Sequence, residues 1–114
     1  MAITETTQAL AAALRQSEEY HAYVSAREKA MENDSIRGFY KEYKRLQMQA
    51  QADAMAGRQS PQTLQQLQHI GELLQFNPDA AEFLLAEYRL NSLLGSVYKL
   101  LAEAVEADLS MLEG

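Results

Sequence analysis

The last third of the chain, residues 78 to 112, most constrains the fold, because its apolar residues cover more of a helix than one neighbour can bury. As a helix it would be about 52 Å long, several times the radius of gyration of about 13 Å expected for a compact domain of 100 residues. Its apolar arc spans about 200°, whereas a helix that faces a single layer needs little more than about 100°. One side carries Phe83, Ala86, Leu90, Leu93, Leu94, Val97, Leu101 and Ala104, and Leu84, Tyr88, Gly95, Tyr98, Ala102, Val105, Leu109 and Leu112 continue around it.

A helix of this kind must touch more than one neighbour. The rest of the chain supplies only shorter helices, so we expect a second copy of the chain to cover it, most simply in a homodimer. Gly95, in the middle of the segment, costs about 1 kcal/mol relative to alanine. It is either a tolerated weak spot or kink, or a place where two helix backbones cross closely.

Three further segments have helical periodicity, and no segment has the alternation of a strand. The first is predicted from about Glu5 to Met31, on a stripe that runs through Leu10, Leu14, Ser17, His21, Val24, Glu28 and Met31. The others are predicted at about 35–56, with Asp34 as its cap and Gly57 as a left-handed C-cap, and at 61–75. Ser60-Pro61 and Asn77-Pro78 each combine a capping side chain with proline at the first helical position. The sequence predicts an all-α, four-helix, elongated fold in one domain, residues 1–114.

Composition excludes several classes of function. The chain contains no cysteine, so it forms no disulfide, thiolate zinc site or self-ligated iron–sulphur cluster, and no cofactor is predicted. A net charge of −6 argues against a dedicated DNA-binding protein. The N-terminus lacks the features of a signal peptide, and no apolar run reaches the roughly 18 residues of a membrane span. We therefore expect a cytoplasmic protein that is not inserted in a membrane.

Glu87 lies near the centre of the apolar arc of the last helix. A buried carboxylate must find donors or take up a proton, and the simplest expectation is a structural pairing with a tyrosine or an arginine from an earlier helix. A contact at an interface is the functional alternative. A carboxylate-bridged metal site built from Glu18, His21, Glu28 and Glu87 is less favoured, because Glu18 and His21 diverge around the helix and a single Glu-x-x-His is common by chance. No metal ligands are therefore assigned.

A basic strip, defined by Arg37, Lys41, Lys44 and Arg45, follows the outer face of the second predicted helix. The simplest interpretation is a solvated face paired with nearby acids, and the alternative is a surface that contacts RNA or an acidic protein. No phosphate-binding loop, nucleophile elbow or metalloprotease pair is present, so no catalytic residue is assigned and an enzyme is not expected.

Several helix faces resemble the YlbF/YmcA/YheA family of small helical proteins from Gram-positive bacteria. The matching residues are Leu10-Ala11, Ser17-Glu18-Glu19-Tyr20, Asp34, Phe39, Gln47, and Ala86-Glu87 with Leu90, Leu93, Leu94, Val97 and Leu101. The resemblance covers about residues 5 to 108. It implies a multihelical fold with long terminal helices that associates with itself or with relatives, in which Tyr20 and Glu87 are structural or interface residues.

The resemblance also implies a regulatory function. Members of the YlbF and YmcA branches regulate competence, sporulation and biofilm formation, join a third protein, and influence messenger RNA processing by RNase Y. Those branches carry cysteines that can hold an iron–sulphur cluster, so the cysteine-free chain is more similar to the YheA-like branch. We expect a regulatory adaptor that self-associates through the last helix, with Leu90, Leu94, Gly95, Val97 and Leu101 in the interface, and that docks a relative or another regulatory protein.

Overall fold

The computed structural model describes residues 1–105, which fold into five helices and contain no strand. They are α1 (Ala2–Arg15), α2 (Glu18–Met31), α3 (Asp34–Met55), α4 (Pro61–Gln75) and α5 (Pro78–Ala104). The all-α prediction is confirmed, and the number of helices is one more than predicted.

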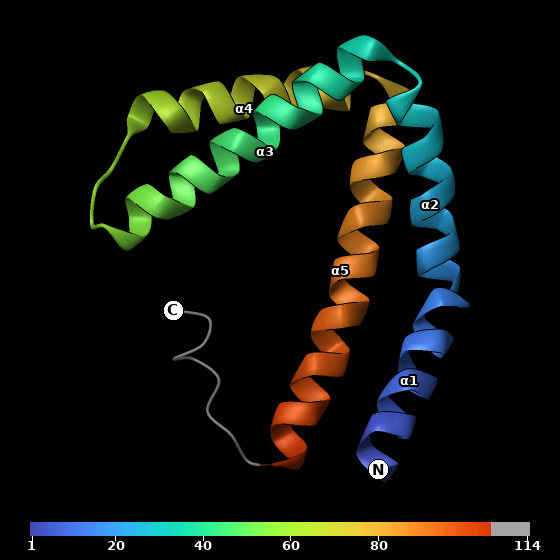
Figure 1. Ribbon diagram of the computed structural model, residues 1–114. Helices are drawn as coiled ribbons and strands as arrows, with labels where there is room; N and C mark the ends of the chain where they lie inside the picture. Colours follow the sequence, from blue (N-terminus) through green and yellow to red (C-terminus); the bar gives the residue numbers. More distant parts are fainter. Residues whose placement is uncertain (106–114) are drawn as a thin grey trace.

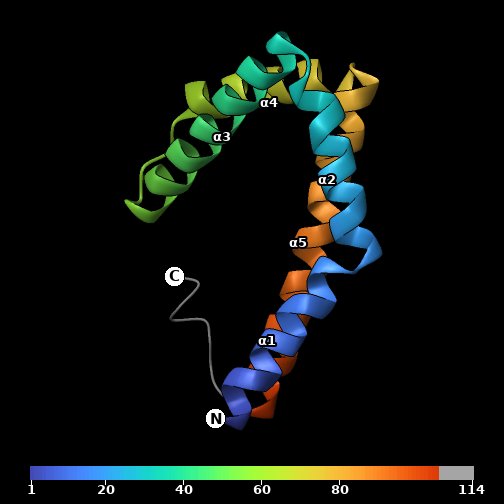
Figure 2. The ribbon, with the colours of Figure 1, turned by 45° about the vertical axis from the view of Figure 1, so that its right-hand side comes forward.

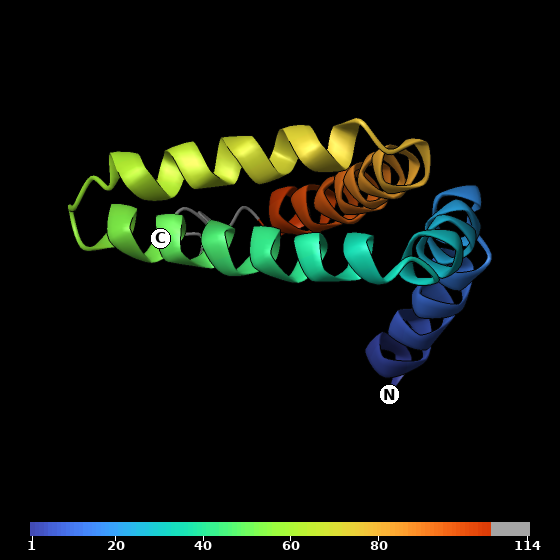
Figure 3. The same cartoon turned by 90° about the horizontal axis from the view of Figure 1, so that it is seen from above.

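The helices form an open V with two arms (Figure 1). The first arm contains α5, α2, which packs along α5, and α1, which follows α2 and diverges from α5 (Figure 3). The second arm is the antiparallel pair α3 and α4, seen side by side from above in Figure 3. The radius of gyration is 17.2 Å, against about 13 Å for a compact domain of this size. The described chain is also flat, with extents of 47 × 38 × 17 Å. Elongation is therefore confirmed.

The prediction of one continuous helix from about Glu5 to Met31 is wrong, because the chain breaks at Ser17. Its backbone is extended, with φ −68° and ψ 152°, and its hydroxyl accepts a hydrogen bond from the Tyr20 amide at 3.2 Å. Gln16 ends α1. A serine that satisfies a free amide at a helix start competes with the continuous helix. Figure 2 shows the break between α1 and α2.

The other helix ends follow the predicted signals, with one correction. Ser60 and Asn77 cap α4 and α5 through their side chains, and Gly57 has a φ of 72° after α3. The cap of α3 is Asn33, whose side chain accepts from the Ser35 and Ile36 amides, so the assignment to Asp34 is wrong. Asp34 is instead the first residue of the helix.

Helix α5 is continuous through Gly95 and ends at Ala104. The prediction that it runs to about Leu112 extends beyond the described residues.

The elbow of the V holds the main apolar core. Phe83 of α5 is 1% exposed, and its ring centroid lies 5.7 Å from that of Tyr23 in α2 and 4.9 Å from that of Tyr40 in α3. The remaining buried residues of this core are Ala26, Ala30, Ile36, Leu74, Ala80 and Ala86. The four alanines let helices approach closely around one large ring, so the two arms are joined where α2, α3, α4 and α5 meet.

A polar triad closes one side of the elbow. The Tyr40 hydroxyl donates a hydrogen bond to Glu87, and the Lys44 ammonium lies 2.9 Å from the other oxygen of that carboxylate. Lys44 also lies 5.3 Å from the centre of the Tyr40 ring. Burial and the neighbouring Glu87 carboxylate raise the pKa of Tyr40 above its ordinary value. The triad therefore ties α3 to α5 directly beside the core.

Removing the Ser17 cap should destabilise the protein. Ser17→Ala leaves the start of α2 without its side-chain acceptor, and we expect the free energy of unfolding to fall by about 1 kcal/mol in chemical denaturation. Ser25→Ala, an exposed position inside α2, is the matched control and should raise stability slightly through helix propensity. Equal effects of the two substitutions would contradict the capping role.

Alkaline titration should detect the triad. The pKa of Tyr40 in the folded protein lies above the unfolded value of about 10. The contribution of its protonated hydroxyl to the free energy of unfolding is therefore complete below about pH 10, and it is lost as the pH rises through the folded pKa. We expect one of the six tyrosines to ionise late in ultraviolet difference spectra, and Tyr40→Phe to remove this late component.

Two variants control this titration. Glu87→Gln should move the late component to lower pH, since it removes the neighbouring negative charge. Tyr20→Phe, at a tyrosine near the start of α2 that does not bind Glu87, should leave it in place. A late component that persists in Tyr40→Phe would show that the triad is not its source.

Candidate functional site

An apolar face of α5 is left uncovered below the elbow. Glu87 marks the side of α5 that faces α3, and the same side continues, at helical spacings of three and four, to Leu94, Tyr98, Leu101 and Val105. These four side chains are 43%, 48%, 54% and 73% exposed. The arms diverge beyond the elbow (Figure 1), so residues 1–105 place no further layer on these four side chains.

A second stripe beside this face includes Gly95. Successive residues of this stripe are separated alternately by four and three positions, which is the spacing found where two helices pack along one another. Its members are Leu84, Tyr88, Asn91, Gly95, Tyr98, Ala102 and Val105. Tyr98 and Val105 therefore belong to both sets. A β-carbon added at Gly95 would meet no atom within 4 Å. Nothing within the described chain therefore requires a glycine here. We call the exposed residues Leu94, Gly95, Tyr98, Leu101 and Val105 the α5 face.

The predicted interface residues fall into different environments. Leu94, Gly95 and Leu101 belong to the α5 face, whereas Leu90 and Val97 are half-buried. Glu87 lies in the elbow triad. Tyr20 is half-buried at the start of α2, with its ring edge-on to His21 at 6.2 Å.

Two important residues were absent from the predicted site. Tyr98 lies at the centre of the α5 face, and the spacing of four from Leu94 could have identified it. Lys44 was assigned only to the basic strip, and the sequence offered tyrosine or arginine as the partners of Glu87. No local signal distinguishes a lysine that reaches across to another helix from one that stays in solvent.

Helix α1 extends the uncovered region. It has no buried residue, and Ile3 is 76% exposed. It makes hardly any close backbone approach to α5, and Figure 3 shows the two helices apart. An isolated helix of this length is only marginally stable in water. The lower halves of α1 and α5 thus lack the packing that normally holds such helices.

The exposed area of the chain supports the same point. It is 8699 Å², whereas a folded monomer of this mass exposes about 6,300 Å². Subtracting an upper bound of about 1,450 Å² for residues 106–114 leaves about 7,250 Å² for residues 1–105, against about 5,900 Å² for a folded monomer of that smaller mass, so the excess is about 1,300 Å². An obligate homodimer buries at least about 1,000 Å² per partner.

The basic strip is largely neutralised by nearby acids. Arg37 pairs with Asp34, Arg45 pairs with Glu42, and Lys44 pairs with Glu87. The Glu42 hydrogen bond raises the pKa of Arg45, and the same bond lowers the pKa of Glu42. Among residues 1–105, Lys41 is the member of the strip without an ion pair. This arrangement offers phosphates little uncompensated positive charge.

The residues considered for a metal site do not converge. Glu18, His21 and Glu28 are exposed on α2, and Glu87 is already bound by Tyr40 and Lys44. The described part of the chain contains no group of three histidine, cysteine or acidic side chains placed to hold an ion.

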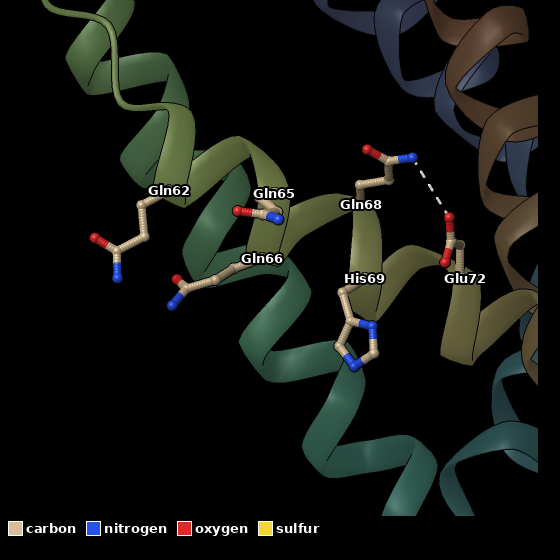
Figure 4. Close-up of a pocket in the computed structure, with 6 residues that line it drawn as sticks. All are labelled: Gln62, Gln65, Gln66, Gln68, His69 and Glu72. Atoms are coloured by element: carbon tan, nitrogen blue, oxygen red, sulfur yellow. Dashed lines mark hydrogen bonds between the residues drawn. The ribbon is translucent and has the colours of Figure 1, made fainter.

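The outer face of α4 is rich in glutamine. Figure 4 shows Gln62, Gln65, Gln66, Gln68, His69 and Glu72 along this shallow surface, with Gln68 donating to Glu72 at 3.4 Å. The side chains point outward and do not meet around a common point, so they form a polar surface without a catalytic arrangement. Within residues 1–105, no helix is both long and apolar enough to cross a membrane.

Known proteins share both the sequence and the fold. A UPF0342 protein of Symbiobacterium thermophilum is 35% identical over 101 residues, covering 88% of this chain and 90% of the relative. A UPF0342 protein of Desulfitobacterium hafniense is 34% identical over 114 residues, covering 92% and 86%.

Two solved structures show the same fold. A protein of unknown function (DUF964) from Bacillus stearothermophilus has a TM-score of 0.79 at 19% identity, covering 93% of this chain and 94% of that one. Bacillus subtilis RicA, solved in complex with RicF, has a TM-score of 0.62 at 22% identity, with coverages of 92% and 94%.

A family profile provides the assignment. The family described as "Control of competence regulator ComK, YlbF/YmcA" matches residues 3–106, and the curated relatives above are UPF0342 proteins, consistent with the YheA-like branch. The chain therefore belongs to the YlbF/YmcA family.

Proposed function

We propose that this protein is a non-enzymatic regulatory adaptor of the cytoplasm that forms a homodimer through α5 and acts by binding other proteins. The observation that carries the proposal is the α5 face, an exposed apolar surface on a helix that packs mainly against α2. The family description links its members to control of a competence regulator. None of the relatives named above carries an enzyme name.

Gly95 supports a helix as the covering element. A glycine inside a helix costs about 1 kcal/mol relative to alanine, and the described chain gains no packing from it. A second α5 that crosses at Gly95 would use the missing side chain, because two backbones can then approach closely. The flanking Leu94, Tyr98 and Leu101 would pack around that crossing.

A two-fold dimer places this face against itself. In an antiparallel crossing at Gly95, residues on one α5 meet residues of the other in reverse order, so Tyr98 of one copy lies near Asn91 and Gly95 of its partner. Tyrosine is well suited to such a contact, since it buries a large ring and keeps a polar tip. The half-exposed α1 of each copy would flank the pair.

Protein partners other than a second copy are also part of the proposal. The structural neighbour RicA was solved in complex with RicF, which supports heteromeric association as a mode available to this fold. In this chain a relative with a matching helix would compete for the α5 face.

Substitutions at Gly95 test self-association. We expect the wild type to have twice the 12.8 kDa mass of one chain in sedimentation equilibrium. Gly95→Leu should weaken the dimer at least tenfold, because the new side chain separates the backbones. Gly95→Ala should stabilise the isolated chain by about 1 kcal/mol and still weaken the dimer.

Gly38 provides the matched control. It lies inside α3, and an added β-carbon there also meets nothing within 4 Å. Gly38→Leu should therefore leave the dimer dissociation constant unchanged, and Tyr98→Glu should raise it. A monomeric wild type, or a dimer indifferent to both Gly95→Leu and Tyr98→Glu, would refute association through this face.

A further inference from the structure

A pocket lies at the apex of the V, where α3, α4 and α5 meet. Its volume is about 340 Å³, and it is lined by Tyr43, Gln68, Gly71, Glu72, Gln75, Phe76 and Leu84. Phe76 is 84% exposed, so an aromatic ring stands open beside it. We call it the apex pocket. It is large enough for bulky apolar side chains and is the size of small ligand sites.

The apex pocket and the α5 face are parts of one surface. Leu84, which lines the pocket, is the first residue of the stripe that passes through Gly95 and ends at Val105. Gly95 lies midway along that stripe, about 16 Å from each end. In an antiparallel dimer that crosses at Gly95, Val105 of one copy is therefore brought to Leu84 of its partner.

We propose that the apex pocket receives the C-terminal end of a second copy, beginning at Val105 and continuing into residues 106–112. This inference rests on the proposed homodimer. In that dimer the C-terminal segment of each copy occupies the apex pocket of the other copy. The incoming segment has apolar residues at Val105, Leu109 and Leu112, separated by four and three positions. Each chain thus carries both a pocket and the segment that fits it.

The same chain cannot supply its own segment. Leu84 and Val105 are about 31 Å apart along α5, and the seven residues 106–112 span at most about 25 Å even when fully extended. These residues of the same chain therefore fall short of the pocket. The second copy begins its segment beside the pocket and needs no such reach.

Three variants test the proposal in the full-length protein. Deletion of residues 106–114 should raise the dimer dissociation constant at least tenfold and leave the helical circular dichroism per residue nearly unchanged. Gly71→Leu should raise it similarly, because the new side chain occupies the pocket. A β-carbon at this position makes an ordinary contact of 3.5 Å with Tyr43, and circular dichroism checks that the larger leucine leaves the helices intact. Phe76→Ser, at a pocket-lining residue that is 84% exposed, is a second pocket variant that leaves the contact between α3 and α4 unchanged and should also raise the dimer dissociation constant. Gly38→Leu is the matched control.

A peptide provides an independent measurement. A synthetic peptide of residues 103–114 should bind the chain that ends at Val105, as measured by calorimetry, and Gly71→Leu should abolish that binding.

Failure of this inference differs from failure of the proposed dimer. If Gly95→Leu dissociates the dimer but both the deletion and Gly71→Leu leave its dissociation constant unchanged, the pocket proposal is overturned and self-association stands. If the wild type is monomeric, both fall. A peptide that binds the chain ending at Val105 equally well with and without Gly71→Leu also overturns the pocket assignment.

Discussion

The packing of Phe83 at the elbow is the contact on which the rest of the structure depends. Its ring lies between Tyr23 of α2 and Tyr40 of α3, and the alanines around it allow four helices to meet in a small volume. Burying such a ring contributes about 2–3 kcal/mol. Apolar packing alone does not fix the orientation of the helices, whereas the hydrogen bond and ion pair of the Tyr40–Glu87–Lys44 triad require a particular geometry between α3 and α5. The two arms are thereby fixed to one another at a single junction.

The consequence of one junction is that the arms are thin beyond it. With a least extent of 17 Å, the described chain has room for pairs of helices and not for a third layer. Each pair buries one side and leaves the other in solvent. On α4 the outer side is polar and glutamine-rich, which suits solvent. On α5 it is apolar, and this difference separates a surface that needs a partner from one that does not.

Much of this arrangement could be predicted from local signals. Ser60-Pro61, Asn77-Pro78 and Gly57 determined three helix ends, because caps act over a few residues. The same chemistry caused the main error: Ser17 was placed on an apolar stripe, although its hydroxyl could equally cap a new helix.

The angle of the V could not be predicted, because it depends on contacts between residues far apart in sequence, such as Tyr40 and Glu87. The breadth of the apolar arc on α5 predicted that the helix needs several neighbours. It could not predict which residues of the arc each neighbouring helix would cover, because that also depends on contacts between distant parts of the chain. Leu90 and Val97 became half-buried within the chain, and Leu94 and Leu101 remained exposed.

The distribution of charge bears on how two such helices would meet. An apolar stripe alone has no direction, and two copies could pack along it in parallel or antiparallel. In a parallel pair the acidic ends, with Glu103, Glu106 and Asp108, would lie together, and like charges in contact are unfavourable. In an antiparallel pair the two acidic ends lie at opposite ends of the dimer, so this repulsion is absent. The stripe is centred on Gly95, so the stripes of two antiparallel helices that cross at this residue face one another along their whole length. Charge and shape therefore favour the same, antiparallel orientation.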